Sequence, residues 1–97
     1  MDISEIVRAE VRARFEYPED QYVERLLEAT AIPPLDRPSR ERDRVHFAIL
    51  MRADGDFAQF ARALATAAID YRDLLMAAGM GNADWPQVLE GAGYPVP

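Results

Sequence analysis

Three prolines within residues 32–38 divide this sequence into two helical parts. The segment reads IPPLDRP. A helix cannot continue through it, because proline lacks the backbone N–H and its ring clashes with the preceding turn. The segment is too short for a disordered tether, so we expect an ordered connector. Residues 1–97 should then form a single all-helical domain, in which a helical hairpin (residues 1–32) is joined by this connector to a main helical bundle (residues 39–92).

Apolar residues on both sides of the connector recur at spacings of three and four, which is the pattern of a helix that buries one face. Before the connector they are Ile3, Ile6, Val7, Val11 and Phe15, followed by Tyr22, Val23, Leu26 and Leu27. After it they include Val45, Ile49, Phe60, Leu64, Leu74 and Leu75. No alternating pattern typical of a strand runs for a useful length. The sequence therefore predicts an all-α fold, a compact bundle of five to six short helices.

Residues that start and stop helices agree with this division. Three pairs have the spacing of a capping box, in which a side chain binds the unpaired N–H groups of the first turn. They are Asp2 with Glu5, Asp56 with Gln59, and Asp84 with Gln87. Ser39 and Asp70 are further expected helix starts, and Gly55, Gly79 and Gly91 are expected stops.

Composition narrows the class of protein. With 49% hydrophobic and 29% charged residues the chain is typical of a globular protein. The absence of cysteine excludes disulfides, thiolate catalysis and cysteine-ligated zinc. No apolar stretch approaches the roughly twenty residues of a membrane span, and the N-terminus lacks the features of a secretory signal. We therefore expect a cytoplasmic protein without a membrane partner.

The charged residues argue against nucleic acid as a partner. The net charge is −6, whereas a general nucleic-acid binder presents a basic field to phosphates. A helix–turn–helix around residues 53–56 would offer only Gln59 and Arg62 to base edges. All eleven basic residues are arginine, which indicates a GC-rich bacterial genome.

A catalytic or metal-binding constellation is not evident. His46 is the only histidine, and it is interpreted either as a general base near Asp43 or as a partly buried helix residue. Ser4 and Ser39 are better explained as helix starts than as nucleophiles. A calcium loop beginning at Asp54 would have Ala65 in the position of its bidentate glutamate. We expect no enzyme, no cofactor and no metal.

Two sets of residues are candidates for binding. Four arginines at the start of a helix oppose the preference of its dipole for acids, and they form a candidate anion site: Arg37, Arg40, Arg42 and Arg44. The apolar stripe of the hairpin must be covered either by the bundle or by another chain. The candidate interface residues are Ile3, Ile6, Val7, Val11, Phe15, Tyr22, Leu26 and Leu27. Trp85 and Tyr94 are a second candidate contact patch or core anchors.

The string AIDYRDLLMAAG at residues 68–79, followed by DWP at residues 84–86, resembles the ending of small uncharacterised bacterial proteins of about this length. The upstream AIL at residues 48–50 and GD at residues 55–56 are similar to the same group. The resemblance covers about the second half of the chain. It implies a bacterial, cytoplasmic origin and supplies no activity or catalytic residue.

These observations lead to a functional expectation. We expect a small, acidic, non-enzymatic helical protein that acts through protein–protein contacts, as a homodimer or an accessory subunit. The alternative is a binder of a small anionic or phosphate-bearing ligand through the arginines of residues 37–44.

Overall fold

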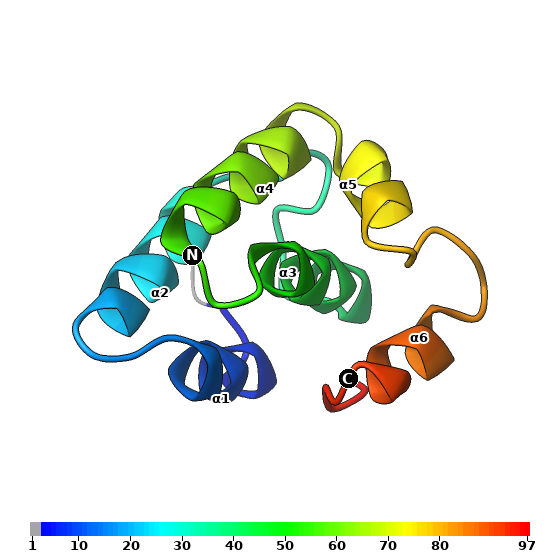
Figure 1. The fold of residues 1–97 in the computed structure, drawn as a ribbon. Coiled ribbons are helices and arrows are strands. Elements are labelled where there is room, and N and C mark those ends of the chain that lie inside the picture. The colour runs from blue at the N-terminus through cyan, green and yellow to red at the C-terminus, as the bar shows by residue number, and fades with distance from the viewer. Residues whose placement is uncertain (1–2) are drawn as a thin grey trace.

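The computed structural model describes residues 3–97 and has an all-α fold, as the sequence predicts (Figure 1). Six helices are present in this range, and no strand. They are α1 (Glu5–Arg14), α2 (Glu19–Ala29), α3 (Arg40–Ala53), α4 (Phe57–Ile69), α5 (Tyr71–Ala77) and α6 (Trp85–Gly91). The predicted connector separates α2 from α3 and contains no helix.

Helix α3 lies at the centre of the molecule, and the other helices surround it (Figure 1). Every residue from position 45 to position 50 of α3 is buried. A helix that is apolar on all sides suits a central position, because it meets neighbours in every direction. The core is built from residues of all six helices, so the hairpin and the C-terminal helices share it.

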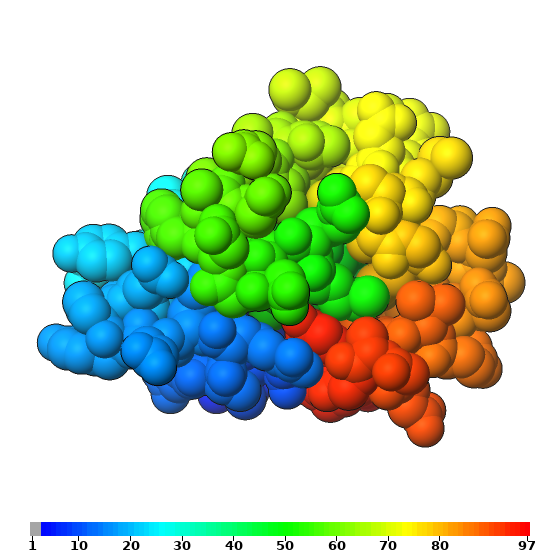
Figure 2. Space-filling model, viewed as in Figure 1, coloured from blue at the N-terminus to red at the C-terminus, as the bar shows by residue number. Residues whose placement is uncertain are grey.

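The C-terminal segment returns to the N-terminal hairpin. Figure 2 shows residues near the C-terminus packed beside α1. The Arg14 guanidinium of α1 donates to the Gly93 carbonyl oxygen at 3.1 Å and lies 4.0 Å from the centre of the Tyr94 ring. Tyr94 also meets Phe47 of α3 edge to face, with ring centres 5.9 Å apart. Tyr94 is therefore a core anchor and not a contact patch.

Most of the predicted helix ends are confirmed. The side chains of Ser39, Asp56 and Asp70 each accept a hydrogen bond from a first-turn backbone N–H. Asp84 precedes α6 as predicted, but its side chain makes no such bond. The first helix is capped by Ser4, whose hydroxyl accepts from the Val7 N–H at 3.4 Å. The predicted cap Asp2 lies outside the described residues.

The turn between α3 and α4 uses two left-handed residues in succession. Asp54 has φ 47° and Gly55 has φ 76°, and a glycine at the second position avoids the steric cost of a side chain there. A Cβ atom on Gly55 would lie 3.4 Å from the Arg14 carbonyl oxygen. The turn therefore also brings the end of α3 close to the end of α1.

Candidate functional site

The apolar stripe expected at an interface is mostly inside the molecule. Ile3, Val7, Val11, Phe15 and Leu27 are buried in the core. The prediction of an intermolecular interface is wrong for these residues, because helices of the same chain already cover them. Phe15, for example, meets Phe60 of α4 edge to face, with ring centres 6.0 Å apart.

The remaining members of the stripe are accessible. Ile6 is half-buried against the core, whereas Tyr22 and Leu26 are 54% and 37% exposed. Helix α2 uses Val23 and Leu27 for the core. Its Glu24 and Glu28 accept hydrogen bonds from α1. Because residues four apart share one side of a helix, Tyr22 and Leu26 lie together on the flank away from α1.

Helix α4 packs beside α2 and adds a second apolar flank to this surface. Its exposed residues Ala58, Ala61, Ala65 and Ile69 are spaced three and four apart and lie on one side of the helix. Its polar residues Gln59, Arg62 and Thr66 line a groove that also has Leu74 and Ala77 of α5, and Arg62, four residues from Ala58, borders the apolar side.

We call Tyr22, Leu26, Ala58, Ala61, Ala65 and Ile69 the α2–α4 face. Every one of these residues is exposed, and Ile69 is 88% exposed. Figure 2 shows α4 and part of α2 next to each other at the surface. None of the six side chains is charged. Sequence periodicity had assigned Tyr22 and Leu26 to a stripe, but it could not join them to α4.

The four arginines of the candidate anion site do not meet at one point. Arg40 and Arg44 are four residues apart and share one side of α3, where both guanidinium groups lie over the Trp85 ring, at 4.6 and 5.3 Å from its centre. Arg42 lies two residues from each and is buried, while Arg37 is exposed in the connector. The prediction of a convergent site is wrong, because a step of two residues turns the helix by about 200°.

Arg40 and Arg44 hold the C-terminal part of the chain on α3. Arg44 donates to the Met80 carbonyl oxygen from Nε at 3.1 Å and from Nη2 at 2.5 Å, and its Nη1 contacts Glu41 at 2.8 Å. Arg40 Nε donates to the Pro97 carbonyl oxygen at 2.9 Å. Trp85 is buried beneath both guanidinium groups, so it is a core anchor and not an exposed contact residue.

Arg42 and His46 form a buried polar pair on α3. They are four residues apart, so they share one side of the helix, and they are 4% and 2% exposed. Burial, with a smaller contribution from the Arg42 charge, lowers the pKa of His46 from 6.5 to about 4. The imidazole is therefore neutral at pH 7. With so low a pKa it is a weak base, and its ring is buried, so the interpretation as a buried helix residue is the one that fits.

A cavity of about 200 Å³ lies beside this pair. It is partly open to solvent and is lined by the end of α2, the connector and α3, and Figure 1 shows the connector passing from the end of α2 to the start of α3. The apolar part of its wall includes Leu27, Ile32 and Leu35. Its polar lining residues are Glu28, Thr30, Asp36, Arg42 and His46. No sequence pattern predicted this cavity, because its walls come from three separate segments.

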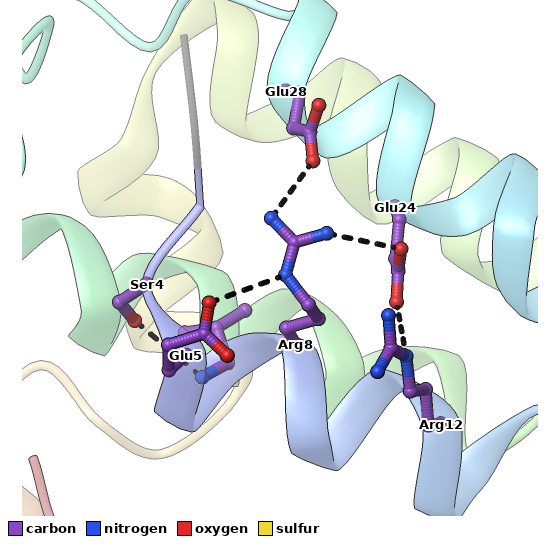
Figure 3. A network of polar contacts seen from close by, with 7 residues as sticks. Ser4, Glu5, Arg8, Arg12, Glu24 and Glu28 are labelled. Atoms are coloured by element: carbon purple, nitrogen blue, oxygen red, sulfur yellow. Dashed lines mark hydrogen bonds and ion pairs between the residues drawn. The ribbon is translucent and has the colours of Figure 1, made fainter.

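A charged network joins α1 to α2 (Figure 3). Arg8 contacts Glu24 at 3.2 Å, Glu28 at 3.3 Å and Glu5 at 3.8 Å, and Arg12 contacts Glu24 at 3.0 Å. The i,i+4 pair of glutamates on α2 therefore binds arginines of the facing helix. Because each arginine here has a carboxylate neighbour, the network is best explained as a set of ion pairs that holds the two arms of the hairpin together.

No group of three or more histidine, aspartate and glutamate side chains within residues 3–97 is arranged to hold a metal ion. Within the same residues no helix is both long and apolar enough to cross a membrane. A comparison of the chain with known protein families, with curated proteins and with solved structures finds no match.

Proposed function

We propose that this protein acts through protein–protein contact and forms a homodimer across the α2–α4 face. The observation that supports this most strongly is the exposure of apolar residues on two helices, α2 and α4, that pack against each other. Contiguous apolar surface of this kind marks interaction sites in soluble proteins, because its burial stabilises the complex.

The chemistry of the face favours a second copy of the same chain as the partner. Ala58, Ala61 and Ala65 have small side chains, so the backbone of another helix can approach α4 closely. In a dimer with two-fold symmetry, the same patch is used by both chains. The six side chains of the face are uncharged and the exposed Arg62 lies at its edge, so two copies can meet on the apolar residues while this charge stays in solvent.

The proposed role is non-enzymatic, and its proposed setting is the bacterial cytoplasm. The weak basicity and the burial of His46, the only histidine in the sequence, support the first statement. The absence of cysteine and the exclusive use of arginine support the second. A different protein as the partner of the α2–α4 face would keep the contact function and change the assembly to an accessory subunit.

The experiment is a light-scattering measurement of molar mass over about a hundredfold range of protein concentration. The wild-type protein should approach twice the chain mass at the upper end. Ala65→Glu places a charge in the centre of the face and should keep the protein monomeric, with an unchanged circular dichroism spectrum. A monomeric wild-type protein at every concentration would contradict the homodimer.

Thr66→Glu is the matched control for this substitution. Thr66 is also exposed and is the next residue of α4, but it is turned by about 100° around the helix and lines the groove with α5. The control variant should dimerise like the wild type. Equal loss of the dimer in both variants would show that added negative charge, and not the α2–α4 face, controls association.

A further inference from the structure

The groove between α4 and α5 has arginines in its lining and no carboxylate. It lies where α3, α4 and α5 pack against one another, and its volume is about 320 Å³. Four other hollows on the described surface are each lined by at least one aspartate or glutamate. The lining residues of this α4–α5 groove are Arg52 of α3, Gln59, Arg62, Ala63 and Thr66 of α4, and Leu74 and Ala77 of α5.

Both arginines of the α4–α5 groove are available to a ligand. Arg52 and Arg62 are exposed, and within residues 3–97 neither of them forms an ion pair. Arg52 also lines the hollow at the α3–α4 turn, together with Asp54 and Asp56, but it pairs with neither carboxylate. Guanidinium stays protonated in proteins, so both positive charges are permanent.

The opposite wall of the groove is apolar. Ala63 and Leu74 are 7% and 2% exposed and form the floor, while Ala77 is exposed on the α5 side. The acid nearest to this wall in the sequence is Asp73, four residues before Ala77 and therefore on the same side of α5. The two walls thus favour different side chains, acidic ones at α3 and α4 and apolar ones at α5.

The spacing along α4 sets the length of a ligand. From Gln59 to Thr66 the helix rises about 10 Å, which an extended peptide spans with about three residues. Successive side chains of an extended peptide point in opposite directions, so two acids can face the arginines while the residue between them faces α5. The Gln59 amide can bind the peptide backbone, and the Thr66 hydroxyl, which donates to the Arg62 carbonyl oxygen at 3.1 Å, can still accept.

From this geometry we infer that the α4–α5 groove binds a short acidic segment of a partner protein, in extended conformation and with the order acid–apolar–acid. The carboxylates pair with Arg52 and Arg62, and the apolar side chain packs on Leu74 and Ala77. A nucleic acid is disfavoured, because the net charge of −6 repels a polyanion and two arginines neutralise few phosphates. The inference goes beyond the proposed dimer, since the groove and the α2–α4 face have no residue in common.

The test is a titration of the nitrogen-15-labelled full chain, followed by its amide chemical shifts. The probe is the peptide Gly-Glu-Leu-Glu-Gly with blocked ends, which should bind with a Kd of about 1 mM or tighter and shift amides of residues 52–77. Gly-Gln-Leu-Gln-Gly lacks the charges and Gly-Glu-Ser-Glu-Gly lacks the apolar side chain, and each should bind about fivefold or more weakly. Absence of shifts at the groove, or equal binding of either control peptide, would overturn the inference.

A single strand of six thymidine nucleotides distinguishes an acidic peptide from other polyanions. The strand carries phosphates but offers no carboxylate and no aliphatic side chain for the α5 wall. It should bind more weakly than the acidic peptide. Binding as tight as that of the peptide would show that the groove recognises negative charge in general, and it would contradict a site for an acidic protein segment.

Three variants locate the contact. Arg62→Gln removes one positive charge and should weaken peptide binding about threefold or more, and Thr66→Glu places a carboxylate in the groove and should weaken it about fivefold or more. Both residues are exposed, so the variants should keep the circular dichroism spectrum of the wild type. Arg37→Gln, in the exposed connector, loses the same charge outside the groove and should bind normally. Equal weakening in Arg37→Gln and Arg62→Gln would show that net charge alone controls binding.

Peptide binding and dimerisation can be separated by one further variant. Leu26→Gln alters the α2–α4 face outside the groove, so it should weaken the dimer and bind the peptide like the wild type. A monomeric wild-type protein that binds the peptide would contradict the homodimer and support the groove. Loss of peptide binding in Leu26→Gln would contradict a binding site within one chain.

Discussion

The two arms of the N-terminal hairpin have similar apolar patterns but use them differently. Helix α1 buries Val7 and Val11, and the chain on either side of it buries Ile3 and Phe15. Helix α2 buries Val23 and Leu27 but leaves Tyr22 and Leu26 in solvent. The comparison teaches that an apolar residue at helical spacing is buried only where a neighbouring helix covers that flank.

The largest expected difference in stability is between substitutions of Phe15 and Tyr17, two aromatic residues at the junction of the two arms. Phe15→Ala removes a ring packed against Phe60 and should lower the free energy of unfolding by about 3–5 kcal/mol. Tyr17→Ala alters a side chain that is 77% exposed and should change it by less than about 0.5 kcal/mol. Urea denaturation measures both values. Similar losses in the two variants would contradict the assignment of Phe15 to the core.

Acid should lower the free energy of unfolding through His46 of α3. The pKa of His46 is about 4 in the folded protein and 6.5 in the unfolded chain, so the unfolded state binds more protons between these values. The free energy of unfolding therefore falls as pH drops from 6.5 to 4, by about 3 kcal/mol from this residue. Asp43 acts in the opposite direction, because burial raises its pKa above 3.8 and acid then favours its folded form.

The measurement for this effect is denaturation by urea at pH 7, 5.5 and 4.5. His46→Gln stays neutral over the whole range, so its stability should depend less on pH than that of the wild type. At the lower pH, hydrogen exchange should show faster amide exchange in residues 27–36, several of which line the cavity beside His46. An equal pH dependence in wild type and His46→Gln would show that other groups cause the loss.

The charged network between the arms should have a smaller effect. Arg8→Gln removes the contacts with Glu24 and Glu28 and should lower the free energy of unfolding by about 1 kcal/mol, with a smaller difference at high salt. Arg72→Gln is the control, because Arg72 forms an exposed ion pair with Asp70. The control should have no measurable effect. A loss in Arg8→Gln that does not depend on salt would contradict an electrostatic cause.

The smallest effect on stability is expected at Leu26. Leu26→Gln changes a side chain of the α2–α4 face and should alter the unfolding free energy of the dilute protein by about 0.5 kcal/mol or less. The same variant should weaken dimerisation in the light-scattering experiment. A large loss of stability at low protein concentration would show that Leu26 belongs to the core of the single chain.

Features that depend on a few neighbouring residues were predicted correctly. The helix starts at Ser39, Asp56 and Asp70 and the left-handed glycine at position 55 follow from hydrogen bonds and backbone sterics within one turn. The connector at residues 32–38 follows from the chemistry of proline. The sequence by itself therefore determined the fold class, the division of the chain and most helix ends, because these are local properties.

Features that depend on which helices meet were decided by the tertiary structure. Arg40 and Arg44 lie over Trp85, Arg42 lines the cavity and Arg37 is exposed, so the four arginines do not form one site. The cavity needs walls from α2, the connector and α3, and the α2–α4 face needs two helices that are not consecutive in the chain. Local sequence fixes the side of a helix that carries a residue, but only packing determines what lies opposite that side.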